Sequence, residues 1–168
     1  MKKHLLAIAI ACSATSAFGN PYIGANIGQA DYDISGFDDP TSWSILAGYN
    51  INEYFAAEIS YTDFGEADDD IAPIWTIDAD AVTAALVATY PINEKFGVFA
   101  KLGAISWDAT LEEQGYGEIA SDDGTDLLYG FGLSYAISPA VDIVGQYLIA
   151  DVDEDDISNL TIGLNYNF

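Results

Sequence analysis

The chain has 168 residues, with 27 acidic side chains and only four Lys or Arg, which gives a net charge of −23. That charge excludes nucleic acid as a partner, because binding to the phosphate backbone needs a basic surface. A disordered acidic chain is also excluded, since 51% of the residues are hydrophobic and 13% are aromatic. No run of about 18 apolar residues occurs, so the chain is not a helical membrane protein. We expect one folded domain.

Residues 1–19 have the features of a secretory signal peptide. Met1–His4 form a basic start, Leu5–Ala11 an apolar stretch too short to span a bilayer, and Ala17–Gly19 a cleavage site with small residues at both ends. A lipoprotein signal ending before Cys12 is the alternative, and its very early position disfavours it.

The expected mature chain, residues 20–168, contains no His, Cys, Met or Arg. Its two lysines, Lys95 and Lys101, against 27 acids give a side-chain charge of −25. Without a disulfide, stability must come from burial and hydrogen bonding. The absence of His and Cys excludes nucleophilic catalysis by Ser-His or Cys-His pairs. Paired carboxylates of the glycosidase type remain conceivable, but no aromatic cleft accompanies them, so we predict no enzyme, no cofactor and no metal site.

Alternation of large apolar and small residues predicts β-strands. At the C-terminus Leu160, Ile162, Leu164, Tyr166 and Phe168 alternate with Asn159, Thr161, Gly163, Asn165 and Asn167. The same period of two predicts eight strands, at about 21–32, 42–50, 54–64, 75–90, 95–108, 125–137, 140–151 and 157–168. The face opposite the large residues is mostly Gly, Ala, Ser, Thr and Asn, which suits a narrow, filled lumen. We therefore predict an all-β fold, a transmembrane eight-stranded antiparallel up-and-down β-barrel.

The predicted connections alternate between short and long, as is typical of transmembrane barrels. The short turns are 50–53, 91–94 and 137–139, and the longer polar loops are 33–41, 65–74, 109–124 and 151–156. At the short-turn end every even-numbered strand ends in a tyrosine: Tyr49, Tyr90, Tyr135 and Tyr166. These residues predict an aromatic girdle at the membrane boundary. A soluble β-sandwich is the alternative, but it would not place four tyrosines at one height.

Several short motifs follow one another along the mature chain: Tyr22–Gly28, Ala47–Tyr49, Glu58–Tyr61, Tyr90–Ile92, Lys101–Gly103 with Trp107, and Tyr135–Ile137 before Pro139. In this order they resemble the OmpA-type eight-stranded outer-membrane β-barrel family. The resemblance implies the outer membrane of a Gram-negative envelope as the location. Phe168 resembles the family's insertion signal, which the barrel-assembly machinery reads. The peptidoglycan-binding domain of many such proteins has no counterpart here, so the resemblance implies no cell-wall tether.

Larger members of that family have a cluster of acidic and basic side chains that plugs the pore. Glu58 and Lys101 match this pattern, and Asp142 is a candidate third member. The positions aligned with the other partners carry no charge: Val87, Ser134 and Val144. We expect Glu58 and Lys101 to pair across the lumen as structural packing, because a buried charge is tolerated only when it is paired. A gate is the alternative.

The acids are distributed unevenly, with 23 of the 27 in or beside the predicted long loops. A solvated surface explains such a rim, and recognition of a basic partner is an alternative. Binding of divalent cations is another alternative. Asp151, Asp153 and Asp155 have the spacing of an EF-hand calcium loop, but the glycine and the glutamate of such a loop are missing. Diffuse bridging to lipopolysaccharide through divalent cations fits the pattern better than a defined site.

We therefore predict a small, non-enzymatic, monomeric outer-membrane barrel with a structural or surface-interaction role. A narrow porin-like channel for ions or small solutes is the alternative, which the small polar residues of the lumen favour. Five large apolar residues that also point inward oppose it: Leu46, Phe99, Ile105, Leu128 and Leu148.

Overall fold

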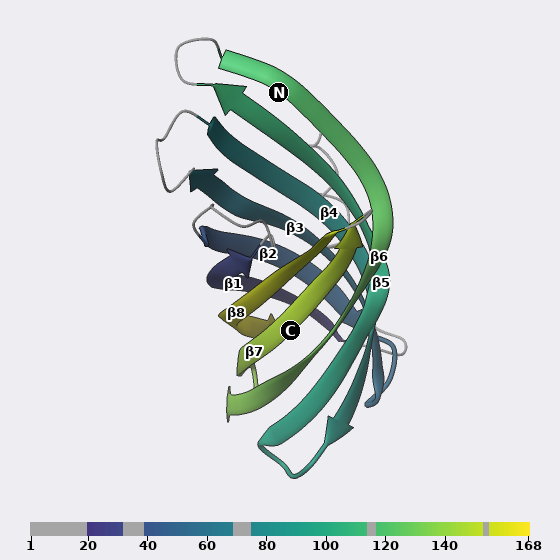
Figure 1. Cartoon of the computed structure of the whole chain (residues 1–168). Helices are drawn as coiled ribbons and strands as arrows, with labels where there is room; N and C mark the ends of the chain where they lie inside the picture. Colours follow the sequence, from purple (N-terminus) through teal and green to yellow (C-terminus); the bar gives the residue numbers. More distant parts are fainter. Residues whose placement is uncertain (1–19, 32–38, 69–74, 114–116, 153–154) are drawn as a thin grey trace.

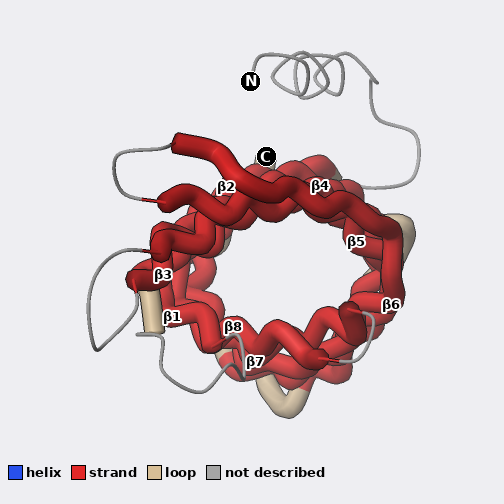
Figure 2. Tube along the Cα trace, turned by 45° about the horizontal axis from the view of Figure 1, so that its top comes forward, coloured by secondary structure: helices blue, strands red, loops and turns tan. Residues whose placement is uncertain are grey.

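The computed structural model describes residues 20–31, 39–68, 75–113, 117–152 and 155–168, and the predicted signal peptide lies outside these ranges. Eight antiparallel strands each pair with the next in the chain, and the first pairs with the last to close a barrel (Figures 1 and 2). The strands are β1 (Pro21–Asp31), β2 (Thr41–Asn50), β3 (Phe55–Asp68), β4 (Trp75–Pro91), β5 (Phe96–Glu113), β6 (Gly117–Ser138), β7 (Val141–Val152) and β8 (Asp155–Asn167). The predicted fold class is confirmed. Among the described residues, none belongs to a helix that is long and apolar enough to cross a membrane.

Side chains alternate between the lumen and the outer surface along the strands. In β1, Tyr22 and Asn26 are buried, whereas Ile23 and Ile27 are 46% and 57% exposed. The outer surface is rich in such large apolar residues, among them Leu86, Leu102, Phe131, Leu133, Leu160, Ile162 and Leu164. A soluble sheet would bury this face, so the outer surface of the barrel suits hydrocarbon.

Both ends of the described barrel lie at the short turns. The N–H of Asn50 donates to the carbonyl of Asn20 at 3.0 Å, and the N–H of Phe168 donates to the carbonyl of Pro21 at 3.1 Å. An even number of antiparallel strands places both ends at the same rim, and the pairing of β1 with β8 closes the barrel.

Two of the short turns have the same hydrogen-bond pattern. The side-chain oxygen of Asn52 accepts the N–H groups of Tyr54 and Phe55, at 2.8 and 2.9 Å. In the next short turn Asn93 accepts the N–H groups of Lys95 and Phe96 in the same way, at 2.9 and 3.0 Å. Asparagine suits this position because its short side chain can bond the backbone two residues on.

The region predicted as the long loop 109–124 is mostly strand, which corrects that prediction. β5 continues to Glu113 and β6 begins at Gly117, and the two stay paired to these ends, apart from a register shift at Leu111/Glu112 that skips Ile119. The prediction failed because this part of the ribbon lacks an apolar face, with pairs such as Asp108↔Asp123 and Thr110↔Ser121. Backbone pairing does not need lipid-facing side chains, so the ribbon continues beyond the apolar band.

The predicted loop 65–74 also begins with strand residues, because β3 continues to Asp68. The register of β3 against β4 shifts between Asp63 and Gly65, where Gly65 has a φ of 81°. The carboxylate of Asp63 accepts the Gly65 N–H at 2.9 Å. Glycine is required here because this left-handed conformation is strained for other residues.

Candidate functional site

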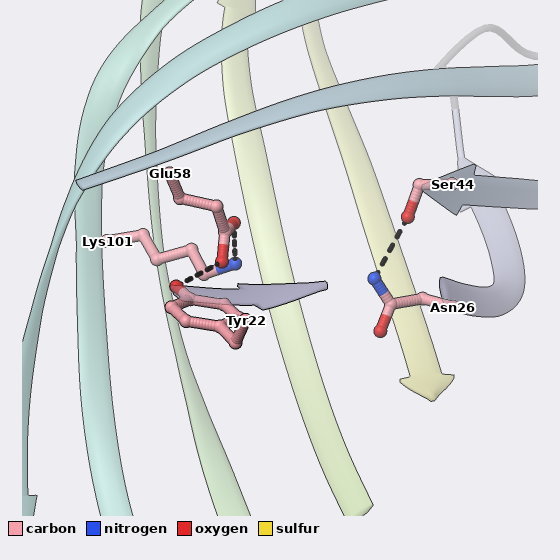
Figure 3. A network of polar contacts seen from close by, with 5 residues as sticks. All are labelled: Tyr22, Asn26, Ser44, Glu58 and Lys101. Carbon is pink, nitrogen blue, oxygen red and sulfur yellow. Dashed lines mark hydrogen bonds and ion pairs between the residues drawn. The ribbon is translucent and has the colours of Figure 1, made fainter. Parts of the chain in front are cut away.

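Three buried polar side chains from different strands meet inside the barrel (Figure 3). Glu58 of β3 forms an ion pair through Oε1 with the Lys101 ammonium group of β5. The Tyr22 hydroxyl of β1 donates to Glu58 Oε2 at 2.9 Å. Each of the three side chains is no more than 9% exposed. Both carboxylate oxygens thus have a donor, which is the condition under which a buried charge is tolerated.

The strand register brings Tyr22 to Glu58. Tyr22 is paired with Gly48 of β2, and Gly48 is paired in turn with Glu58. Since Gly48 has no side chain, the tyrosine ring can lie across β2 and reach the next strand. The sequence analysis did not include Tyr22 in the site. Its position was predictable, because Tyr22 is two residues before Gly24 and four before Asn26 and therefore faces the lumen as they do.

Of the three uncharged positions that the resemblance aligns with further charges, two carry buried apolar side chains and the third is Ser134. Val87 and Val144 belong to a buried cluster with Tyr22, Leu46, Ala56 and Phe99. The Lys101 ammonium nitrogen also lies 5.6 Å from the centre of the Phe99 ring, within the range of a cation–π interaction. Lys101 therefore has Glu58 as its anionic partner and Phe99 as an aromatic neighbour.

A cavity of about 430 Å³ extends from this network to the short-turn end of the barrel. Asp142, the predicted third member of the cluster, lines this cavity with Ser134 and accepts a hydrogen bond from Asn167 at 2.8 Å. The buried side-chain oxygens of Gln146 and Asn165 line it as well and have no hydrogen-bond partner among the described residues.

Apolar side chains fill the other half of the lumen, toward the long loops. Ile105 is only 1% exposed, and the cluster around it includes Phe64, Trp107 and Leu128. The Trp107 indole N–H donates to Asp126 at 2.7 Å, so its polar atom is satisfied while its ring fills space. Sequence reasoning did not find this pair. The five inward apolar residues predicted from the sequence all lie inside, where Leu46, Phe99, Ile105 and Leu128 are buried and Leu148 packs against the cluster.

Polar pairs occupy other lumen positions. Asn26 donates to Ser44 at 3.0 Å (Figure 3), and Ser42 donates to Asn159 at 2.7 Å. The first pair joins the neighbouring strands β1 and β2, whereas the second reaches from β2 past β1 to β8. The described lumen is therefore packed by small polar pairs as well as by apolar side chains.

The four tyrosines of the predicted girdle lie at the short-turn ends of their strands. Tyr49, Tyr90 and Tyr166 are exposed on the outer surface. Tyr135 is half-buried because its ring packs 4.7 Å from that of Phe96, and Tyr166 meets the terminal Phe168 edge to face at 5.1 Å. This end of the outer surface thus has an aromatic border.

Acidic side chains mark the opposite rim. Asp122, Asp123 and Asp156 are exposed there, whereas Glu53 and Glu94 lie in the short turns. Part of the predicted acidic rim, including Asp153 of the EF-hand-like spacing, lies outside the described residues. Within the described residues, no group of three or more His, Cys, Asp or Glu could hold a metal ion.

The closed antiparallel barrel, its apolar outer band and its packed lumen define a transmembrane β-barrel of the outer-membrane class. A family model described as "Outer membrane protein beta-barrel domain" matches residues 4–168. The chain therefore belongs to the family of outer membrane protein β-barrel domains and resides in the cell outer membrane.

The chain is similar in sequence to outer membrane protein A of several bacteria. It is 29% identical to that of Salmonella typhi over 197 residues and 28% identical to that of Escherichia coli O157:H7 over 192 residues. Both alignments cover 100% of this chain, but only 56% and 55% of those relatives. The chain thus spans a little over half the length of these relatives.

Solved structures share the fold at lower identity. Neisserial surface protein A has a TM-score of 0.70 and 20% identity, with 89% of this chain and 97% of that chain covered. Ail, the attachment invasion locus protein of Yersinia pestis, has a TM-score of 0.65 at the same identity and coverage. The β-barrel domain of Pseudomonas aeruginosa OprF also has a TM-score of 0.65, at 11% identity.

Proposed function

We propose that this chain is a small, non-enzymatic barrel that is anchored in the outer membrane and presents an acidic rim for interaction at the cell surface. The packing of Ile105, Trp107 and Leu128 in the lumen is the observation that carries the proposal. A lumen filled by apolar side chains is a structural core, which leaves the rims as the surfaces that can act on other molecules.

The chemistry of the expected mature chain supports a non-enzymatic role. Residues 20–168 contain neither histidine nor cysteine, so acid–base or nucleophilic catalysis would depend on carboxylates alone. Both oxygens of the buried Glu58 carboxylate already have partners within the chain, Tyr22 and Lys101. We assign the Glu58–Lys101 pair a structural role.

A narrow channel is the second candidate, and the cavity at the short-turn end favours it. Conduction would also require a path through the apolar cluster around Ile105, which opposes ion passage. Planar-bilayer recording tests the two functions against each other. We expect no stable openings, and openings that change when Glu58 or Lys101 is replaced would overturn the structural assignment.

The charge of the rim indicates which partners it can bind. One solved structure holds Ail of Yersinia pestis in complex with the heparin analogue sucrose octasulfate. A sulfated ligand does not suit this chain, because its mature part has two lysines against 27 acids. We propose basic partners instead, and lipopolysaccharide only where divalent cations bridge the two negative surfaces.

The proposal also covers how the chain reaches the outer membrane and inserts there. The first 19 residues direct export and are removed, and the barrel-assembly machinery recognises Phe168 at the end of β8. The girdle tyrosines Tyr49, Tyr90, Tyr135 and Tyr166 then set the depth of a monomeric barrel in the membrane. Gel mobility of heated and unheated samples tests closure, since a closed barrel changes its mobility on heating.

Adhesion of whole cells tests the surface role. Cells expressing the chain should bind a surface coated with a basic protein more than cells without it, and shortening the 109–124 ribbon should reduce binding. Equal binding by all three strains would contradict the proposed role. Detection of the barrel in outer-membrane fractions of the two expressing strains confirms that the full and shortened barrels reach the membrane.

A further inference from the structure

One stretch of β6 has a strand neighbour on one side only. Residues 117–126 pair with β5, from Glu113↔Gly117 to Ile105↔Asp126, with a register shift at Leu111/Glu112 that skips Ile119. The pairing of β6 with β7 begins only at Leu127↔Asp151. In Figure 1, β6 accordingly continues past the end of β7 to the top of the view. Within the described residues, no strand pairs with the other side of this stretch.

Most of this edge is accessible from residue 119 onward, with Gly124 and Asp126 half-buried. Residues 119–123 are all exposed, which happens when neither face of a strand is covered. The N–H of Asp123 donates to the carboxylate of its neighbour Asp122 at 3.0 Å, a local bond that an incoming strand can replace. An unpaired edge of this kind can accept an extended peptide as a further strand.

The negative charge of residues 117–126 favours a basic peptide over an acidic or neutral one. The stretch contains four acids, Glu118, Asp122, Asp123 and Asp126, and no basic residue. Asp126 bonds the lumen residue Trp107, so by the alternation of the strand Asp122 lies on the same face and Asp123 on the opposite face. In an added strand, two consecutive basic residues also point to opposite faces, so one can lie beside Asp122 and the other beside Asp123.

A second copy of this chain is a poor occupant of the same edge. Pairing two such edges would place acids beside acids, and like charges at facing positions destabilise a sheet. The edge is therefore protected against self-association while it stays open to a cationic strand.

We propose that residues 117–126 bind an extended basic peptide segment by strand addition, with two consecutive lysines or arginines opposite Asp122 and Asp123. This inference rests on the proposed surface-interaction role and names the surface and the chemistry of the partner. The backbone of the edge supplies the hydrogen bonds, and the two aspartates supply the selectivity.

The test uses the full barrel in detergent micelles and a peptide of about ten residues, alternating threonine and valine around a central pair of lysines. We expect binding, with slower hydrogen exchange of amides in 117–126. A peptide of the same composition with the lysines two positions apart should bind roughly threefold more weakly, since both charges then lie on one face. A peptide N-methylated along one edge should bind at least about tenfold more weakly.

Two double variants distinguish the effect of the charges at this edge from the effect of the protein's net charge. D122N/D123N should weaken binding roughly three- to tenfold, while E53Q/E94Q, which removes two charges at the short turns, should leave it unchanged. Equal binding of the N-methylated peptide, or equal weakening by both double variants, would overturn strand addition and leave non-specific attraction.

The outcome is distinguishable from failure of the proposed function. If cells displaying the barrel adhere to a basic surface but the peptide neither binds nor protects 117–126, strand addition is wrong and the surface role stands. If neither adhesion nor peptide binding occurs, both proposals are wrong.

Discussion

The ring of Tyr22 covers the backbone of Gly48 on the neighbouring strand. A Cβ atom at Gly48 would lie 2.1 Å from the tyrosine Cζ and 2.4 Å from its hydroxyl oxygen. The same arrangement recurs where Phe99 pairs with Gly132 and where Trp107 pairs with Gly124. In this barrel, glycines thus make room for large aromatic side chains inside a narrow lumen.

Replacing Gly48 with alanine should destabilise the barrel by about 1–3 kcal/mol. The added methyl group forces the Tyr22 ring to move, and the hydroxyl then loses its bond to Glu58. Urea unfolding in detergent micelles, followed by tryptophan fluorescence, measures the change. Gly145→Ala is the matched control, because no atom lies within 4 Å of its added Cβ, and it should change stability by less than about 0.5 kcal/mol. Equal effects of the two variants would show that the aromatic contact is unimportant.

Lys101→Met should cost about 3–5 kcal/mol, because it leaves the Glu58 carboxylate buried without its cation. Glu58→Gln should also destabilise, since it leaves the ammonium group of Lys101 unpaired. The double variant should recover most of the loss, because a neutral side chain then faces an apolar one. The same unfolding assay completes the double-mutant cycle. Simple addition of the two single effects would mean that the pair is not energetically coupled.

The direction of most side chains was predictable from the sequence, because parity along a strand determines which face each residue occupies. Ile162 and Leu164 are outside for this reason, and Leu128 and Ile105 are inside. Pairing between distant strands was not predictable in the same way. The Glu58–Lys101 pairing was expected only from a family resemblance, and the contact of Tyr22 depends on a register that periodicity does not contain.

The ends of the strands were less predictable than their middles. The ribbon of β5 and β6 continues through polar residues such as Thr110 and Ser121, where hydrophobic alternation has already stopped. Hydrophobic alternation identifies only the part of a strand whose side chains face lipid or the core. Backbone hydrogen bonds can continue to pair two strands where both are surrounded by water. Trp107 and Asp126 lie within the predicted strands, and their bond was missed because it depends on the register between β5 and β6, which alternation does not determine.

Truncating the apolar cluster should make the lumen leaky. The double variant Ile105→Ala/Trp107→Ala removes two buried side chains from the half of the lumen near the long loops. We expect small steady conductance from this variant in planar bilayers and none from the unaltered chain. Phe131→Ala is the control, because that side chain is 64% exposed on the outer surface. Heated and unheated gel samples establish that each barrel is closed. Steady openings of the same size from the unaltered chain would contradict a sealed lumen.

The two asparagine turns should contribute independently to stability. Asn52→Ala and Asn93→Ala each remove an acceptor for two backbone N–H groups, and water replaces it only in part at these exposed turns. We expect a loss of about 0.5–1.5 kcal/mol for each variant in urea unfolding. Since the turns are separate and share no partner, the double variant should lose the sum of both. Glu94→Ala, in the second of these turns, should change stability by less than about 0.5 kcal/mol and controls for altered turn composition. A control loss as large as that of Asn93→Ala would mean that the side-chain bonds do not stabilise the turn.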